Sequence, residues 1–120
     1  MRTVSFSLAV LVAVMSLALA PRAAAESHVE LILDASGSMF NKLDDGRYRI
    51  VAAKDVLTQL IAALPETEGL NVGLRVYGSE LRGSDPGSCE DSRLFVPIEG
   101  VARRSLLDTV RNTEARGSTP

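Results

Sequence analysis

The sequence predicts an α/β domain, and two observations support that prediction. Apolar segments of strand type alternate with segments whose apolar residues recur every three or four positions, in the order strand, helix, strand, strand, helix. The first apolar segment gives way to a loop of small polar residues, and in open α/β sheets ligands bind beyond the carboxyl ends of the strands. Because 120 residues suffice for one domain at most, we expect a single domain.

The first predicted strand is the short apolar run at residues 29–33. A run this apolar fits a strand buried on both faces, as in a parallel sheet covered by helices. A turn at residues 41–46 precedes a predicted helix, which ends at Pro65. Its apolar face, expected to pack on the sheet, consists of Ile50, Ala53, Leu57, Leu60, Ile61 and Leu64.

Residues 71–77 alternate with period two and predict a second strand. Its apolar set is Val72, Leu74 and Val76. The first strand, the helix and this strand can form a right-handed crossover between parallel strands.

Residues 78–88 are rich in Gly, Ser, Asp and Pro and predict a loop. Residues 93–96 predict a third strand closed by Pro97, which suits a sheet edge because proline lacks a ladder donor. A second helix is predicted over residues 101–111, before the chain enters a loop at residues 117–120.

The N-terminus has the features of a secretory signal peptide. Arg2 precedes an uncharged apolar run at residues 8–20, and small residues follow at 23–25. We expect cleavage after Ala25, because Pro21 argues against the alternative site after Ala20. A retained membrane anchor is the other interpretation, but the run is shorter than the roughly 20 apolar residues that cross a bilayer. The predicted product is residues 26–120, exported to the periplasm or extracellular space, without a membrane span.

The charge balance argues against a nucleic-acid partner. Cleavage removes Arg2 and Arg22, which leaves 11 basic and 15 acidic residues and a net charge of −4. The sequence also has no cluster of lysine and arginine. Cys89 is the only cysteine, so an exported chain would hold it either buried and unpaired or bonded to a partner beyond residue 120.

Asp34, Ser36 and Ser38 occupy the loop that follows the first strand. An extended start to this loop can point all three oxygens the same way, because side chains alternate along an extended chain. Gly37 would let the backbone turn tightly between the serines. One carboxylate and two hydroxyls are hard oxygen donors, which suit Mg²⁺, Mn²⁺ or Ca²⁺ better than zinc or copper.

Residues 31–39, Leu-Ile-Leu-Asp-Ala-Ser-Gly-Ser-Met, resemble the D-x-S-x-S signature of von Willebrand factor A (VWA) domains. These domains house a metal-ion-dependent adhesion site (MIDAS). Residues 117–120, Gly-Ser-Thr-Pro, resemble the family's second site loop, and the intervening elements occur in the expected order. The resemblance implies a Rossmann-like fold, with a central, mostly parallel sheet flanked by helices. Residues 42–47, 72–78 and 89–92 also resemble bacterial exported members.

The resemblance implies a role for each matching residue. Ser36, Ser38 and Thr119 would hold a divalent cation, Mg²⁺ first and Mn²⁺ or Ca²⁺ as alternatives, directly or through water. Asp34 would ligate the cation or orient its ligands. A Glu or Asp of a partner protein would fill the remaining position, because neutral hydroxyl ligands leave the cation poorly neutralised and attractive to a carboxylate. The implied function is metal-dependent protein binding and not catalysis.

The resemblance covers little more than the first half of such a domain. The third site loop with its aspartate has no counterpart, so we expect a partial VWA domain, truncated after its second helix. A remnant without function is therefore an alternative. A serine hydrolase using Ser36 is another alternative. Asp34, however, occupies the position of the first glycine in the G-x-S-x-G nucleophile elbow, and a catalytic triad would require His28 to reach Ser36.

Overall fold

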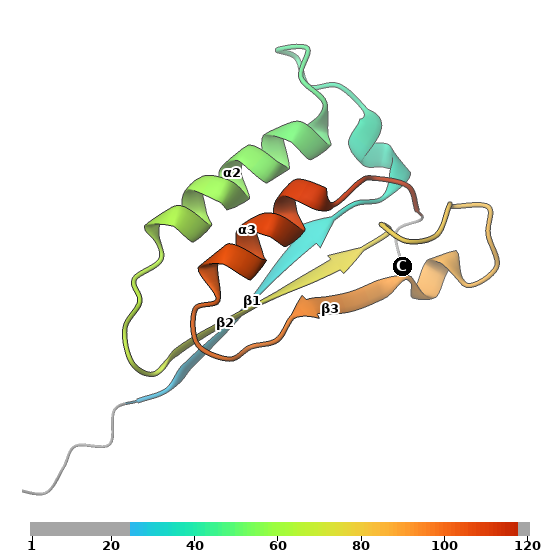
Figure 1. Ribbon diagram of the computed structural model, residues 1–120. Coiled ribbons are helices and arrows are strands. Elements are labelled where there is room, and N and C mark those ends of the chain that lie inside the picture. The colour runs from blue at the N-terminus through green and yellow to red at the C-terminus, as the bar shows by residue number, and fades with distance from the viewer. Residues whose placement is uncertain (1–24, 118–120) are drawn as a thin grey trace, which may run out of the picture.

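The computed structural model describes residues 25–117 (Figure 1). The predicted signal peptide lies outside these residues except for Ala25, and so does Thr119. The described elements are strand β1 (Ser27–Asp34), a 3₁₀ turn (Gly37–Phe40), helix α2 (Arg49–Ala63), strand β2 (Leu70–Tyr77), a second 3₁₀ turn (Ser88–Glu90), strand β3 (Ser92–Val96) and helix α3 (Arg103–Asn112). The predicted order of strands and helices is confirmed.

The sheet is mixed and has the order β1-β2-β3. β1 runs parallel to β2 along its whole length, with Ser27 opposite Leu70 and Asp34 opposite Tyr77. The parallel pair expected on either side of the first helix is thus confirmed. β3 pairs antiparallel with β2 and lies at the edge of the described sheet, where Pro97 follows it. The protein is therefore a small α/β domain with three strands and two helices in its described part.

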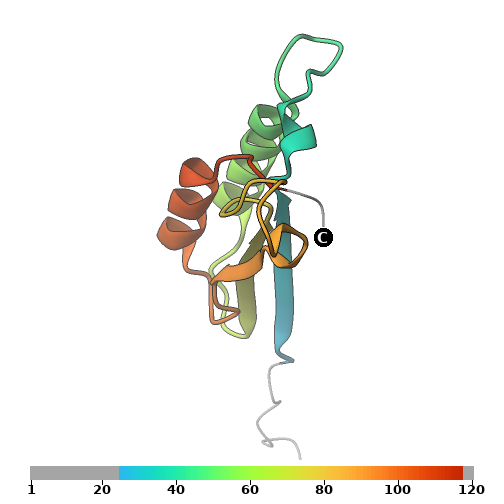
Figure 2. The same ribbon diagram turned by 90° about the vertical axis from the view of Figure 1, so that its right-hand side faces the viewer.

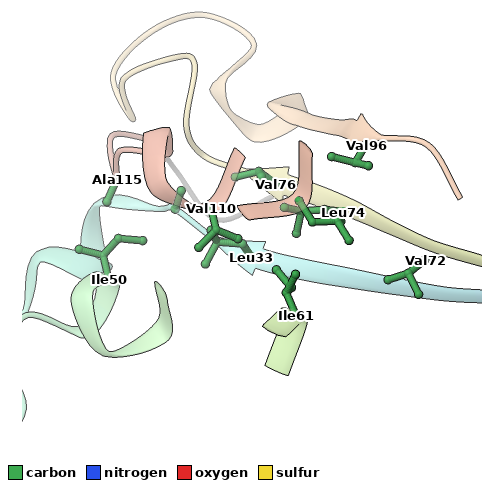
Figure 3. Close-up of a cluster of buried hydrophobic side chains, with 11 residues drawn as sticks. Leu33, Ile50, Ile61, Val72, Leu74, Val76, Val96, Val110 and Ala115 are labelled. Carbon is green, nitrogen blue, oxygen red and sulfur yellow. The ribbon is translucent and has the colours of Figure 1, made fainter. Parts of the chain in front are cut away.

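Both helices cover one face of the sheet (Figures 1 and 2). Their buried residues meet the inward side chains of all three strands in one hydrophobic cluster (Figure 3). Burying a side chain of this size contributes about 1.5–3 kcal/mol, so this layer dominates the stability of the fold. The cluster consists of Leu33, Ala35, Ile50, Ile61, Val72, Leu74, Val76, Val96, Leu106, Val110 and Ala115.

The opposite face of the described sheet carries no helix. Ile32 in the middle of β1 is 60% exposed, and Glu30 and Arg75 form an ion pair across β1 and β2 on this side. The prediction that the first strand is buried on both faces is therefore wrong for the described structure. The apolar composition of β1 reflects one buried face and one face on which Ile32 contacts solvent.

The helices differ from the predictions in detail. Ile50 and Ile61 of α2 are buried as expected, but Leu60 is 44% exposed, so its assignment to the packed face is wrong. Helix α3 begins at Arg103, two residues after the predicted start at Val101, because Val101 pairs with Val72 in an isolated parallel bridge. An extended backbone at Val101 is incompatible with the first turn of a helix.

Candidate metal site at the end of the first strand

Asp34 is the last residue of β1, and its carboxylate organises the loop that follows. Its Oδ1 accepts a hydrogen bond from the Ser36 amide at 2.8 Å. The hydroxyls of Ser36 and Tyr77 also approach the carboxylate closely enough to act on its pKa. Tyr77 ends β2 directly opposite Asp34, so the parallel register places this phenol at the site. The sequence analysis missed Tyr77, since only the strand pairing brings it to Asp34.

Ser36 and Ser38 are brought together as predicted. Their Oγ atoms lie 3.1 Å apart. A hydrogen bond joins the two hydroxyls, and either of them can donate its proton. Ser36 is 2% exposed, whereas Ser38 is exposed. The three side chains thus form a connected row of oxygens that runs from the sheet to the surface.

The electrostatics favour an ionised Asp34. Partial burial acts to raise the pKa of this carboxyl, but the hydrogen bonds from Ser36 and Tyr77 outweigh it and hold the pKa below its ordinary value of 3.8. Burial, with the hydrogen bond to Asp34 and its negative charge, raises the pKa of Tyr77 from 10.0 to about 12. The site therefore holds a carboxylate and a neutral phenol near neutral pH.

The start of the second loop lies against the first. Ser36 and Gly117 form a parallel bridge, in which the Gly37 amide donates to the Gly117 carbonyl at 2.7 Å. The Arg116 amide donates to the Ala35 carbonyl at 2.8 Å. Residue 117 is the last described position, so the location of Thr119 is not given by this contact. The bridge brings the backbone just before that loop next to Ser36.

Close packing at this contact requires glycine at residue 117. A Cβ on Gly117 would lie 2.6 Å from the Gly78 Cα and 2.9 Å from the Leu81 carbonyl oxygen, both backbone atoms. Gly37 is different, because its φ is not positive and an added Cβ would meet only the Gly117 oxygen at 3.5 Å. The prediction that Gly37 is needed for a tight turn is wrong. The glycine that the geometry demands is Gly117.

Asp91 supports the site from the neighbouring loop. It is 7% exposed, and its Oδ2 accepts hydrogen bonds from the amides of Glu80 and Leu81, both at 2.9 Å. Its carbonyl accepts the Gly78 amide, while the Gly78 carbonyl accepts the Gly117 amide at 2.8 Å. Asp91 thus fixes the loop against which Gly117 packs. No local pattern predicts this role, because the hydrogen-bond partners of Asp91 lie ten and eleven residues away along the chain.

Other sequence-based candidates lie elsewhere. His28, the only histidine in the sequence, lies near the start of β1, six residues before Asp34. At roughly 3.3 Å per residue of strand, the two residues are about 20 Å apart. The structure therefore does not assemble a Ser-His-Asp triad around Ser36. Cys89 is exposed and free among the described residues, so the buried alternative for this thiol is wrong.

The described part of the chain offers no competing metal site of the usual acidic or imidazole type. No group of three or more His, Cys, Asp and Glu side chains there could hold a metal ion. The candidate site has a different donor set, namely one carboxylate with hydroxyls. A search of residues 25–117 also finds no helix with the length and hydropathy that crossing a membrane requires.

A hollow of about 570 Å³ lies between α3, the end of β3 and the loop after β2. It contains the carboxylates of Glu80, Asp108 and Glu114. Each of them forms an ion pair, with Arg93, Arg111 and Arg116 respectively. Since these acids are neutralised by arginine, the hollow does not offer a second cation site.

Comparison with known proteins gives little information on function. No family model matches the chain. The chain is similar to an uncharacterized protein of Bacillus subtilis (strain 168), YwmC, with 33% identity over 101 residues that cover 82% of this chain and 43% of the relative. The chain thus spans less than half the length of the curated relative that it matches.

Among solved structures, the chain is similar to an uncharacterized membrane spanning protein from Vibrio fischeri. The identity is 20%, the TM-score is 0.48, and the match covers 78% of this chain and 44% of that one.

Proposed function

We propose that this protein is an exported domain of the von Willebrand factor A type that binds an acidic side chain of a partner protein through a divalent cation. The observation that carries the proposal is the convergence of Asp34, Ser36 and Ser38 at the carboxyl end of a parallel strand, where ligands bind in open α/β sheets. The contact between Ser36 and Gly117, which adjoins the second motif, supports it further.

The oxygen donors fit Mg²⁺ better than softer metals. Octahedral Mg²⁺ with ligands at about 2.1 Å places neighbouring ligand oxygens about 3.0 Å apart, and Ca²⁺ at about 2.4 Å places them about 3.4 Å apart. The Ser36 and Ser38 oxygens, which a hydrogen bond holds 3.1 Å apart, are close enough for both to bind one such cation. Ser36, Ser38 and Thr119 would hold the ion, with Asp34 as ligand or as acceptor of the hydroxyl protons.

The protein's own contribution would be to orient neutral oxygens and to keep the site open. A bound cation would supply a positive charge that a carboxylate of the partner can reach. Because Ser38 is exposed while Ser36 is buried, the free side of the site faces solvent at Ser38. The finer assignment to a Rossmann-like VWA fold belongs to the same proposal, and the parallel β1-β2 pair with α2 between them in sequence supports it.

Calorimetric titration with MgCl₂ tests this proposal. We expect Ser38→Ala to weaken Mg²⁺ binding at least about tenfold, which corresponds to about 1.4 kcal/mol, because the exposed hydroxyl ligand is lost. Ser105→Ala is the matched control, since Ser105 is exposed on α3 and should leave Mg²⁺ affinity unchanged. Circular dichroism verifies that each variant is folded.

Three results would count against the proposal. These are no Mg²⁺ binding by the folded protein, equal affinities of the wild type and Ser38→Ala, or a chain that stays unfolded in Mg²⁺. The last result would favour the alternative of a remnant without function.

A further inference from the structure

The segment directly after the candidate site exposes large apolar side chains. Phe40 is 55% exposed, Tyr48 44% and Leu43 39%. The rings of Phe40 and Tyr48 contact each other edge to face, with centroids 6.2 Å apart and planes at 82°. We call Phe40 and Tyr48, whose rings contact each other, the aromatic patch. Exposed apolar clusters of this kind mark interaction sites in soluble proteins, because aromatic rings gain most from burial.

The backbone holds the aromatic patch in a preformed shape. Residues 41–49 project from the body of the domain as a hairpin-like excursion (Figure 1). Lys42 and Tyr48 form an antiparallel bridge, and the Leu43 amide donates to the Arg47 carbonyl at 2.8 Å. Asp45 in turn accepts hydrogen bonds from the Arg47 amide at 3.0 Å and from its Nε at 2.8 Å. The backbone that carries these apolar side chains is therefore already ordered in the free protein. A partner would bind it without the entropy cost of ordering this segment.

The charges near the patch indicate what kind of partner fits. The Lys42 ammonium lies 5.4 Å from the centroid of the Tyr48 ring, which places a positive charge at the patch. A cation at Ser36 and Ser38 would add a second one. Residues 41–49 carry three basic side chains, Lys42, Arg47 and Arg49, against Asp44 and Asp45, so the segment has a net charge of +1. An acidic protein segment with an apolar neighbour complements this arrangement.

The patch is also close enough to act together with the site. Phe40 belongs to the same 3₁₀ turn as Ser38 and follows it by two residues, a rise of about 4 Å along the axis. An extended peptide advances about 3.3 Å per residue. One or two residues of an extended partner segment therefore span the separation between Ser38 and Phe40 along the chain.

We propose that the aromatic patch is a specificity subsite, which selects partner segments that carry an aromatic or large aliphatic side chain within two residues of the captured Asp or Glu. This inference rests on the proposed metal-dependent function of the same site.

Three synthetic fluorescent peptides of equal length test the subsite, with central Asp-Phe, Asp-Gly and Asn-Phe. Anisotropy titrations are run with MgCl₂ and with EDTA. We expect Asp-Phe to bind about fivefold to tenfold tighter than Asp-Gly, the range that one added aromatic contact provides. Asn-Phe should bind weakly, and EDTA should abolish binding.

Variants separate the two sites. Phe40→Ala should remove most of the preference for Asp-Phe and change the Asp-Gly affinity less than about twofold, since the oxygen ligands remain. Val56→Ala is the matched control, because Val56 is 65% exposed on α2 and lies outside the patch. It should leave all affinities unchanged. Ser38→Ala should abolish Mg²⁺-dependent binding of every peptide.

The outcomes distinguish the two proposals. If Asp-Phe and Asp-Gly bind equally, or if Phe40→Ala keeps the preference, the subsite is overturned while the metal-dependent function stands. If no peptide binds in an Mg²⁺-dependent manner, both are overturned. Patch-dependent self-association in ultracentrifugation, or patch-dependent cosedimentation with phosphatidylglycerol vesicles, would assign the patch to another occupant and overturn the subsite.

Discussion

Gly117→Ala is the substitution that most directly tests how the two loops of the candidate site are joined. The added Cβ would lie 2.6 Å from the Gly78 Cα and 2.9 Å from the Leu81 oxygen. Carbon atoms in contact prefer about 3.5–4.0 Å, so backbone must move by about 1 Å. Because both clashing atoms belong to the main chain, a change of side-chain rotamer cannot relieve the overlap.

The expected cost follows from what the movement breaks. The hydrogen bonds from the Gly37 amide to the Gly117 oxygen, at 2.7 Å, and from the Gly117 amide to the Gly78 oxygen, at 2.8 Å, contribute about 1 kcal/mol each. Overpacking costs about 1–3 kcal/mol if the loop resists the movement. Whether the loop moves or resists, the free energy of unfolding should therefore fall by about 1–3 kcal/mol, a substantial part of the 5–15 kcal/mol typical of a domain.

Urea unfolding followed by circular dichroism measures this loss. Gly37→Ala is the matched control, because its Cβ would meet only the Gly117 oxygen at 3.5 Å and its φ is not positive. It should change the stability by less than about 1 kcal/mol. Equal stabilities of the two variants would refute the argument that close approach at Gly117 joins the loops.

Two further predictions concern the support of the fold and the titration of the site. Arg103 donates hydrogen bonds to the carbonyls of Ile61, Ala62 and Leu64 at the end of α2, so Arg103→Ala should cost about 2–3 kcal/mol in urea unfolding. The exposed neighbour Arg104, changed to alanine, should cost less than about 0.5 kcal/mol, and a similar loss for both would contradict the capping role. Since the pKa of Tyr77 is raised in the folded state to about 12, its stabilising effect should be complete below pH 10.0 and disappear as the pH rises through about 12. Ultraviolet titration of phenolate should show a transition near pH 12 that Tyr77→Phe removes, and retention of that transition in the variant would show that it does not belong to Tyr77.

The regular elements could be predicted because their signals are local. The alternation of Val72, Leu74 and Val76 requires one face of a strand to be buried, and all three are buried in β2. Pro65 lies two residues beyond the end of α2, as a helix terminator should. The proximity of Ser36 and Ser38 could also be predicted from the sequence, because side chains two positions apart in an extended segment point the same way.

Errors arose where a second segment decides the outcome. Leu60 has the spacing of a packed residue, but the described sheet and α3 leave it exposed, so periodicity overestimated the buried face. Ile32 was expected to be covered, yet no described helix lies on its side of the sheet. Gly37 was assigned a conformational role that its backbone does not require.

By itself, the sequence determined the order of strands and helices and the row of oxygens at Asp34, Ser36 and Ser38, since these depend on periodicity and on neighbours within a few residues. Only the tertiary structure decided that Tyr77 lies opposite Asp34 and acts on the pKa of its carboxyl, and that Gly117 packs on Gly78 and Ser36. These contacts join residues about 40 and 80 positions apart, through strand register and backbone packing, which no local pattern encodes.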